Sequence, residues 1–381
     1  MTETIRARNV ILGAGAMGTA AAYHLARRGE PVLIVEQFTP GHARGSSHGA
    51  ARITRHSYSD PRYARLMLDA FAAWRQLEAD SGQCLYIRTG GVSFCPGRHD
   101  YAARVAKSLA AIGVVHRQMS GSDWNGLQPE FRLPGDYDVV FEPDAGILSA
   151  ARALAAQIEM ARSLGGNATR VLEGCRVDRI DLDGPRPVLL AGNLRIEAER
   201  LVVAAGAWAG RLLPGLDAEL RPTRQQVLYM KPADAAAYAI GRFPAFIYIG
   251  ETPQDAFYGM PDFLATGVKA ARHHGPEVDP DLDDREPAHD YAGCVQEFLR
   301  RHIPALAEAP IVSQEVCLYT VADDENFRVG PWPGRPDVVL ASPCSGHGFK
   351  FACLVGRVVA DLMMRGETDV DISPWALPAR A

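Results

Sequence analysis

The chain has 381 residues, which is long enough for two domains and a sizeable core. Its 47% hydrophobic and 22% charged residues are ordinary for a globular protein, and a formal net charge of −5 argues against nucleic acid or an anionic membrane as the main partner. No run of 18 apolar residues predicts a membrane span, and the first residues, MTETIRARN, lack the apolar part of a signal peptide. The seven cysteines form no C-x-x-C pair, so we expect reduced thiols, no metal site and a cytoplasmic location.

The first elements form a strand–helix–strand unit with a G-x-G-x-x-G motif. Its parts are a strand over 10–12, the motif glycines Gly13, Gly15 and Gly18, a helix over 19–28 and a strand over 32–35. Gly13 suits a tight turn, Gly15 lets the backbone approach a pyrophosphate, and Gly18 lets the helix pack closely on the strand. Glu36 follows the second strand, where a carboxylate accepts hydrogen bonds from a ribose. The unit predicts a site for FAD or NAD rather than NADP, although a fortuitous glycine-rich turn would have the same spacing.

A polar segment rich in Gly, Ser and His follows Glu36, and further elements follow it along the chain. They are a helix over 61–77, a strand pair or bulge over 86–94, helices over 100–112 and 149–164, strands over 175–182 and 200–206, and a strand, a glycine-rich turn and a long helix over 338–364. Residues 224–320 alternate between apolar and polar side chains, which predicts a mostly antiparallel sheet.

This layout predicts an α/β (α+β two-domain) fold in which two domains are interleaved along the chain. A Rossmann-like nucleotide-binding domain would comprise residues 1–85, 145–223 and 321–381. A substrate domain with a mostly antiparallel sheet would comprise residues 86–144 and 224–320.

Several motifs in order along the chain resemble those of one enzyme family. They are GAGAMG (13–18), GSSHGAARITRHSY (45–58), TGG (89–91), LVVAAGAWA (201–209), YGMP (258–261), GVKAARHH (267–274), CLYT (317–320) and SGHGFKF (345–351). The combination resembles the monomeric sarcosine oxidase and N-methyltryptophan oxidase group of flavin amine oxidases, which have the glycine/D-amino-acid oxidase fold. The resemblance covers nearly the whole chain and implies FAD rather than NAD, a small amino-acid substrate, O₂ as the acceptor and a monomer.

Such enzymes oxidise a secondary amino acid by hydride transfer to flavin N5, after which the imine is hydrolysed and O₂ is reduced to hydrogen peroxide. By resemblance, Arg55 and Lys350 hold the substrate carboxylate, for which Arg offers a planar bidentate donor and Lys a point charge. The alternative for both side chains is solvation at the surface.

Three further side chains take chemical roles through the same resemblance. Cys317 matches the cysteine that carries the flavin through a thioether, and a core cysteine is the alternative. Lys269 matches a lysine that stabilises negative charge on O₂, and an exposed lysine at a strand end is the alternative. Arg52 and His48 lie on the loop that would face the flavin ring, and either could be structural instead.

The remaining candidates shape the cofactor and substrate sites. The cofactor set is Gly13, Gly15, Gly18, Glu36, Ser46, Arg52, Val177, Gly206, Trp208, Cys317, Gly346, His347, Gly348, Phe349 and Lys350. The helix after SGHGFKF would stabilise negative charge on the reduced flavin, and the Gly346 carbonyl would accept from the substrate amine. Tyr258, His273 and Ile247 would form the pocket, whereas His274 is expected to be a solvated neighbour.

The chain departs from the family pattern at three places near the expected pocket. Asn326 stands where relatives tend to have His, Pro343 and Cys344 stand where they tend to have Gly and Phe, and the stretch over 247–258 is about two residues longer than in sarcosine oxidases. These departures leave the substrate open. A flavin dehydrogenase or biosynthetic flavoprotein with another acceptor or an imine substrate, and a non-catalytic flavin-binding subunit, remain as alternatives.

Overall fold

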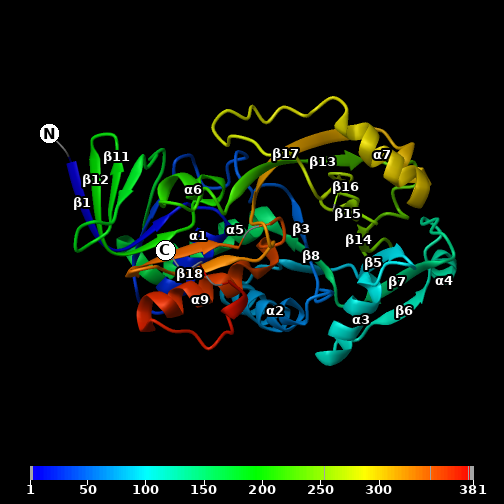
Figure 1. Cartoon of the computed structure of the whole chain (residues 1–381), viewed down its shortest axis with the longest axis horizontal. Coiled ribbons are helices and arrows are strands. Elements are labelled where there is room, and N and C mark those ends of the chain that lie inside the picture. Colours follow the sequence, from blue (N-terminus) through cyan, green and yellow to red (C-terminus); the bar gives the residue numbers. More distant parts are fainter. Residues whose placement is uncertain (1–2, 253, 344, 376, 378–381) are drawn as a thin grey trace.

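A mostly parallel sheet carries the glycine-rich turn at its carboxyl edge. The computed structural model describes residues 3–252, 254–343, 345–375 and 377. Its first sheet has the order β10-β11-β12-β1-β2-β9, with β19 joined to β12 and β18 to β19 (Figure 1). The strands are β1 (Glu3–Leu12), β2 (Val32–Val35), β9 (Arg170–Leu172), β10 (Arg179–Asp181), β11 (Val188–Ala191), β12 (Leu194–Val203), β18 (Arg328–Trp332) and β19 (Arg335–Ser342). Leu12 of β1 is in register with Val35 of β2 and Val203 of β12, so the turn after β1 lies beside Glu36 and Ala204.

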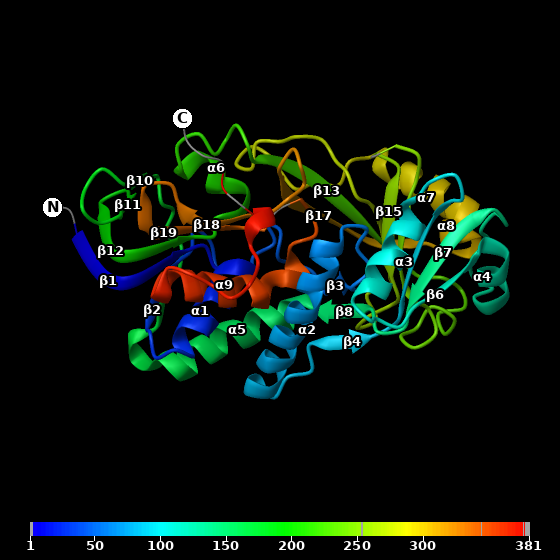
Figure 2. The ribbon, with the colours of Figure 1, turned by 60° about the horizontal axis from the view of Figure 1, so that its bottom comes forward.

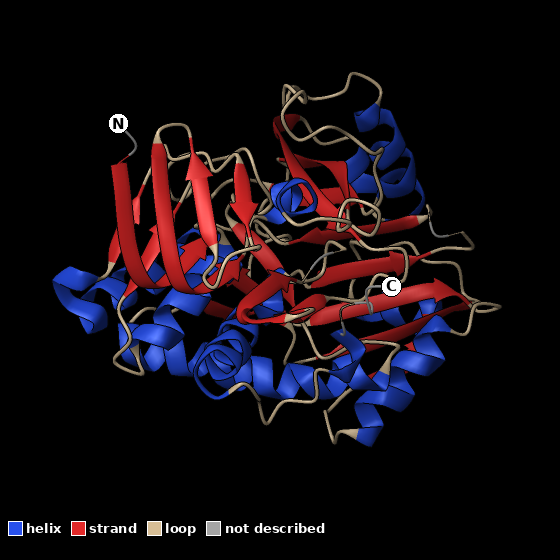
Figure 3. Cartoon of the chain, turned by 60° about the vertical axis from the view of Figure 1, so that its left-hand side comes forward, coloured by secondary structure: helices blue, strands red, loops and turns tan. Residues whose placement is uncertain are grey.

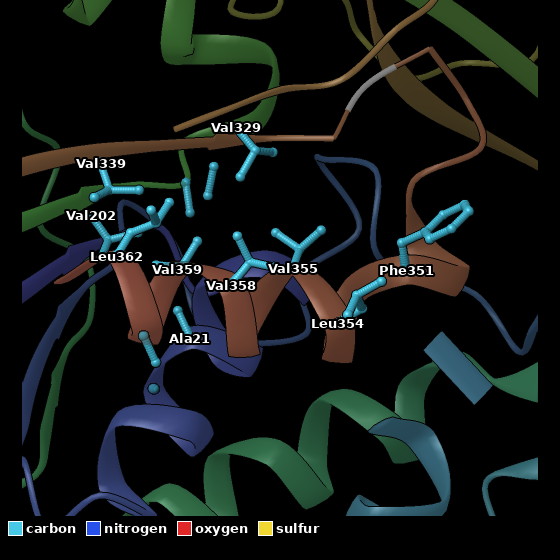
Figure 4. Close-up of a cluster of buried hydrophobic side chains, with 14 of the residues drawn as sticks. Ala21, Val202, Val329, Val339, Phe351, Leu354, Val355, Val358, Val359 and Leu362 are labelled. Carbon is cyan, nitrogen blue, oxygen red and sulfur yellow. The ribbon is translucent and has the colours of Figure 1, made fainter. Parts of the chain in front are cut away.

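Helices α1 (Ala16–Ala26) and α9 (Ala352–Arg365) pack on one face of this sheet. Helices α2 (Pro61–Ser81) and α5 (Ala150–Gly165) lie on the same side and pack against these two helices (Figures 2 and 3). In Figure 4 the apolar side chains of α9 point toward the strands that carry Val202, Val329 and Val339. The short helix α6 (Ala209–Leu212) follows β12. The burial of these apolar faces fixes the position of the loops that leave the carboxyl ends of the strands.

The second large sheet is mostly antiparallel and forms the other half of the molecule (Figure 1). Its order is β17-β13-β16-β15-β14-β5-β7-β6. The strands are β5 (Gly91–Pro96), β6 (Arg117–Ser120), β7 (Tyr137–Glu142), β13 (Arg221–Met230), β14 (Ala245–Ile249), β15 (Ala256–Met260), β16 (Val268–Arg272) and β17 (Ile311–Val321). Only the β14–β5 pair in this sheet is parallel among the described strands, and it joins the two segments of the chain that the sequence assigns to the substrate domain.

Helices α4 (Gly121–Leu127), α7 (Tyr291–His302) and α8 (Pro304–Ala307) pack on this second sheet around a core rich in aromatic side chains. Helix α3 (Tyr101–Ala111) packs on strands β5 and β7 in a separate apolar cluster. Three-residue 3₁₀ helices complete the fold: η1 (Gly166–Ala168), η2 (Gly206–Trp208), η3 (Phe349–Phe351) and η4 (Ser373–Trp375). No described helix is both long and apolar enough to cross a bilayer.

A small sheet with the order β3-β8-β4 lies between the two large ones (Figure 1). Its strands are β3 (Ala51–Thr54), β4 (Tyr86–Arg88) and β8 (Gly146–Ser149). Strand β3 carries Arg52, and the chain leaves it at Arg55. The small sheet contains residues from both sides of the expected boundary near residue 85, so the exact domain limits stay a prediction.

The α/β two-domain class is confirmed, whereas several element limits are wrong. The helix expected over 19–28 begins at Ala16, because its N-terminus directly follows the second motif glycine. The strand expected over 175–182 is reduced to β10, because the Cys175 N–H bonds the Glu36 carbonyl at 2.8 Å instead of joining a ladder. The region over 86–94 forms two strands that belong to different sheets. Helix α7 lies within the stretch expected to be sheet.

Candidate active site

A cavity of 840 Å³ extends along the junction of the sheets and gathers the predicted site residues. All of them line its wall except Gly18, and His274 lines it as well. Its wall combines residues from the segments expected to bind the nucleotide with residues of β14, β15, β16 and β17. One elongated site therefore contains the candidates that the sequence distributes along the whole chain.

The turn between β1 and α1 forms a cradle at one end of the cavity. Gly13 has φ of +105°, which L side chains rarely adopt, and a Cβ there would lie 2.4 Å from the Ala204 carbonyl oxygen. A Cβ on Gly18 would lie 1.9 Å from the Gly13 oxygen, so Gly18 acts through close packing behind the wall. The N-terminus of α1 begins at Ala16 with no acidic residue in its first turn. This cradle fits a pyrophosphate, because the residues at the positive end of the helix dipole line the cavity.

Glu36 is buried at the end of β2 and keeps its carboxylate beside the cradle. One carboxylate oxygen accepts from the Ala14 N–H at 2.7 Å, and the other accepts from the Phe38 N–H at 2.9 Å. The carboxylate retains further acceptor positions toward the cavity, since each oxygen has two lone pairs. This geometry suits the hydroxyls of a ribose, and Val177, Gly206 and Trp208 line the same end.

A loop from the second half of the molecule covers this end from outside. We call residues 278–285 the strap; in Figure 1 it belongs to the yellow loop that reaches from α7 back toward α6. Asp281 of the strap accepts from Trp208 Nε1 at 2.8 Å and from Arg176 Nη2 at 2.8 Å. Arg285 donates to the Arg44 carbonyl at 2.9 Å. The strap therefore holds three segments that surround the dinucleotide end.

Positive charge gathers near the middle of the cavity. Arg52 donates through Nη2 to the carbonyls of Ser46 at 2.9 Å and His48 at 2.5 Å, which fixes its guanidinium against the loop. Burial and Arg52 lower the pKa of His48 to about 4, so this imidazole is neutral at pH 7. Lys269 is 5% exposed, and burial together with Arg52 lowers its pKa to about 7. A neutral His48 and a readily deprotonated Lys269 thus lie beside a permanent cation.

Cys317 and a carboxylate complete this middle region. Cys317 of β17 is buried and lines the cavity, and burial raises the pKa of its thiol. Glu315, two residues earlier on the same strand, accepts from the Tyr229 hydroxyl at 2.8 Å. Lys269 lies 5.7 Å from the centre of the Tyr229 ring. Sequence reasoning missed Glu315 and Tyr229, because only the pairing of β13 with β16 and β17 brings them to Lys269.

Two basic side chains lie close together in another part of the cavity wall, where Lys350 is buried and Arg55 is half-buried. Arg55 lies 4.6 Å from the centre of the Tyr58 ring, and Lys350 donates to the Tyr58 hydroxyl at 3.1 Å and to the His347 carbonyl at 2.9 Å. Burial and Arg55 lower the pKa of Lys350 well below its ordinary value. Nε and Nη1 of Arg55 are buried without a hydrogen-bond partner among the described residues. Unpaired guanidinium donors are costly, so they indicate a position for an anionic ligand.

Hydrogen bonds around His347 determine its tautomer and show which groups near Lys350 donate and which accept. Burial and Lys350 lower the pKa of His347 to about 3, so the ring is neutral. Its Nε2 lies 3.0 Å from the Glu325 carbonyl, which only accepts, so Nε2 carries the proton. Nδ1 then accepts from the Tyr58 hydroxyl at 3.1 Å, and the Tyr58 oxygen accepts from Lys350. Sequence reasoning missed Tyr58 as a site residue, although it is the last residue of the motif over 45–58.

Aromatic side chains form the wall between the two cationic regions. Tyr258 lies opposite Ile247 in the β14–β15 pair, and its hydroxyl is 3.5 Å from the Tyr319 hydroxyl. Burial and neighbouring cations lower the pKa of His273 to about 3, so it adds no charge at neutral pH. A Cβ on Gly346 would lie 2.3 Å from Tyr319 Cε2, so only glycine permits this approach. Sequence reasoning also missed Tyr319, although its position in the CLYT motif, two residues after Cys317, could have indicated a role in the site.

The three departures from the family pattern border the same cavity. Asn326 lines it and accepts from the Tyr63 hydroxyl at 3.2 Å, and Pro343 lines it as well. Cys344 lies outside the described residues. The stretch over 247–258, which the resemblance predicts to be longer than in sarcosine oxidases, is the β14–β15 hairpin, and its residues 247–252 and 256–258 line the cavity.

Known proteins resemble this chain over nearly its whole length. Residues 8–362 match the protein family described as FAD dependent oxidoreductase, abbreviated DAO. Monomeric sarcosine oxidase of Bacillus sp. (strain B-0618) is 33% identical over 97% of this chain and 95% of the relative. N-methyl-L-tryptophan oxidase of Salmonella arizonae is 31% identical over 97% of both chains. Among solved structures, the open form of NikD, an unusual amino acid oxidase essential for nikkomycin biosynthesis, has a TM-score of 0.83 at 24% identity over 98% of this chain and 97% of that chain.

Proposed function

The chain belongs to the DAO family of FAD-dependent oxidoreductases, and from this premise we propose that it oxidises a secondary amino acid, either N-methylated or cyclic, with O₂ as the acceptor. In the proposed reaction the amine loses two electrons and two protons and becomes an imine, which water hydrolyses. O₂ receives the electrons and protons and leaves as hydrogen peroxide. The observation that carries the proposal is the half-buried Arg55, whose Nε and Nη1 atoms are buried and unpaired among the described residues and which lines the same cavity as Lys350.

The substrate carboxylate would bind between Arg55 and Lys350. The Arg55 guanidinium offers a planar pair of N–H donors, and Lys350 adds a positive charge and a further donor. Because Lys350 and the Nε and Nη1 atoms of Arg55 are buried, their attraction for a carboxylate is stronger than it would be in water. A carboxylate bound there would satisfy the Arg55 atoms that lack a partner in the described protein.

The same cations would favour the neutral form of the substrate amine. An ammonium group beside Arg55 and Lys350 would experience like-charge repulsion, so its pKa would fall. The neighbouring imidazoles of His273 and His347 are uncharged at neutral pH, so they add no positive charge to this effect. We propose that the Gly346 carbonyl accepts from the amine N–H, and that Tyr258 and Ile247 enclose the N-alkyl group.

The cofactor would lie between the cradle and this substrate end. Its pyrophosphate would lie at the turn over 13–18 and its ribose at Glu36, while Arg52, His48 and the segment over 346–350, which line the same cavity, would surround the ring. Bound FAD supplies the two-electron acceptor for the amine. We propose that Cys317 holds the cofactor covalently, since its thiol is buried and lines the cavity at this position.

Lys269 would act in the oxygen half of the reaction. Its ammonium form places a positive charge in a buried region, where it lowers the free energy of negative charge that develops on O₂. A pKa of about 7 also lets the side chain release and regain a proton near neutral pH. We further propose that the enzyme acts as a monomer, as the name of its sarcosine oxidase relative states.

Peroxide stoichiometry tests the proposed function. Holoenzyme is incubated in air with N-methyl and cyclic amino acids, and amine loss and peroxide formation are measured together, with Arg55→Met as the control variant. We expect one peroxide for each amine consumed by the wild type. Amine oxidation that requires an artificial acceptor and yields no peroxide would establish a dehydrogenase instead. A flavin that is inert to every amine would support a non-catalytic role.

A further inference from the structure

Glu142 lies at the end of β7 and is completely buried behind the substrate end of the cavity. It is not among the residues that line the cavity, so it touches neither the substrate position nor the cofactor position. A carboxylate without solvent contact is costly unless hydrogen bonds stabilise its charge. The partners of Glu142 therefore define what this group does.

Among the described residues, the Glu142 carboxylate accepts hydrogen bonds from two consecutive residues, His56 and Ser57. The His56 backbone N–H lies 3.0 and 3.1 Å from the two carboxylate oxygens, and His56 Nδ1 lies 2.6 Å from Oε1. Oε2 accepts from the Ser57 N–H at 3.0 Å and from the Ser57 hydroxyl. Although burial alone would raise the pKa of Glu142, the donors of His56 and Ser57 hold it below its ordinary value. Glu142 is thus an anion that binds one short piece of backbone.

That piece of backbone separates Arg55, which belongs to the proposed carboxylate site, from Tyr58, which holds the Lys350 side chain of that site. Arg55 precedes it and Tyr58 follows it, and both line the cavity. Tyr58 contacts the Arg55 guanidinium through its ring and accepts from Lys350 through its hydroxyl. A shift of residues 56–57 would therefore move the guanidinium and the acceptor of Lys350 together.

Residues 56–57 are also held from the side opposite Glu142, through the ring of His56. The His56 ring stacks on Phe71 of α2, with ring centres 4.2 Å apart and an angle of 12° between the planes. Phe71 belongs to the core beneath the nucleotide-binding sheet, whereas Glu142 belongs to the second sheet. The segment 56–57 is therefore fixed between the two halves of the molecule.

We propose that Glu142 is a positioning residue for substrate selection: by fixing residues 56–57 it orients Arg55 and Tyr58 so that the site distinguishes a carboxylate from a neutral group of the same shape. The inference rests on the proposed carboxylate site and adds the residue that holds it in place. Because Glu142 acts through the backbone, its loss should reduce discrimination more than it reduces general binding or cofactor content.

Glu142→Gln is the informative substitution, because it keeps size and removes charge. Glutamine has one acceptor oxygen, while its NH₂ group would face the N–H donors of His56 or Ser57. Two donors cannot pair, so the backbone must move. Ser57→Ala is a milder second variant that removes only the hydroxyl bond and leaves the backbone bonds to Glu142 in place.

The probes are cyclopentanecarboxylate and cyclopentanecarboxamide, which share the ring of a cyclic amino acid and have no oxidisable nitrogen. Their dissociation constants are measured from changes in flavin absorbance of the holoenzyme. For Glu142→Gln we expect affinity for the carboxylate to fall by about tenfold or more, as for loss of one well-oriented charged hydrogen bond, while affinity for the carboxamide changes less than about threefold. Ser57→Ala should change the ratio of the carboxylate and carboxamide dissociation constants in the same direction, by a smaller factor.

Asn125→Ala is the matched control, since Asn125 makes two hydrogen bonds to the backbone of Leu133 in the same half of the molecule and does not line the cavity. It should leave the ratio of the two dissociation constants unchanged. The inference is overturned if Glu142→Gln lowers the affinity for the carboxylate and for the carboxamide by the same factor. It is also overturned if Glu142→Gln and Ser57→Ala both keep the wild-type ratio of the two dissociation constants. In either case Glu142 is only structural. If the wild type itself does not prefer the carboxylate, the proposed carboxylate site fails rather than the role of Glu142.

Discussion

Replacing Lys269 by methionine should stabilise the protein in a pH-dependent way. Burial and Arg52 lower the pKa of Lys269 from 10.5 to about 7. The folded protein therefore binds fewer protons than the unfolded chain between about pH 7 and 10.5, so this lysine makes stability rise with pH in that window. Methionine fills similar space and does not titrate. The free energy of unfolding of Lys269→Met should exceed that of the wild type by about 4 kcal/mol at pH 7 and by about 2 kcal/mol at pH 9.

Urea unfolding of the oxidised holoenzymes at pH 7 and pH 9, followed by tryptophan fluorescence, measures this difference. An oxidised flavin ring carries no charge and would bury the Lys269 ammonium further, so the pKa of Lys269 is also lowered in the holoenzyme. Lys107→Met on the exposed side of α3 is the control and should show no pH-dependent gain. A gain for Lys269→Met that is equal at both pH values would refute the assignment of Lys269 as a buried, desolvated cation.

The same variant separates the two half-reactions of the enzyme. Because Lys269 is proposed to stabilise charge on O₂, Lys269→Met should reoxidise about 10²- to 10³-fold more slowly, with little change in anaerobic flavin reduction. In the wild type, reoxidation should slow as pH rises and the ammonium loses its proton. Stopped-flow absorbance measures both rates, and equal oxygen kinetics in the two proteins would remove Lys269 from this role.

Three further substitutions test other parts of the site. Cys317→Ser should release flavin into the supernatant on acid precipitation, whereas wild-type flavin should stay with the protein; free flavin from the wild type would show that no covalent bond exists. In the Cys317→Ser background, Asp281→Asn should weaken the bonds from Trp208 and Arg176 and raise the rate of FAD release by about tenfold, measured as recovered flavin fluorescence; an unchanged rate would mean that the strap does not retain the cofactor. Arg55→Met should raise KM for a carboxylated amine by about 10²-fold and leave its methyl ester nearly unaffected, and an equal loss for both would contradict a carboxylate contact.

The nucleotide end could be predicted from sequence because its signals are local. Gly13, Gly15 and Gly18 stand within six residues, and Glu36 follows at the end of the next strand. The geometry of the turn is imposed by backbone sterics, so spacing alone indicates it. The limits of the helix were less well predicted, since α1 begins at Ala16.

The substrate end was predicted only in part, because long-range packing assembles it. Arg55 and Lys350 were identified through the resemblance of their motifs. Tyr58 and Tyr319 stand in those same motifs, yet their role appears only when the hydroxyl groups are placed in space. Glu142 is 86 residues from its partner His56 in the sequence, and no local pattern joins a carboxylate at a strand end to such a distant segment.

Helix α7 shows the same limit for the fold. Its residues lie in a region where alternating strands dominate, and its apolar side chains at Val295, Phe298 and Leu299 face the aromatic core of the second sheet. Packing against a sheet stabilises such a helix more than its own residue preferences do. A short amphipathic segment among strands is therefore difficult to recognise before the core is known.

Anaerobic titration of the bound flavin tests the central claim most directly. Holoenzyme without O₂ is mixed with sarcosine, N-methyl-L-tryptophan, L-pipecolate, L-proline or a glycated amino acid, and the flavin absorbance is recorded. We predict bleaching by at least one of these secondary amino acids, and recovery of the absorbance with peroxide release when air is admitted. Absorbance that no member of the panel changes would contradict the assignment as an oxidase of secondary amino acids.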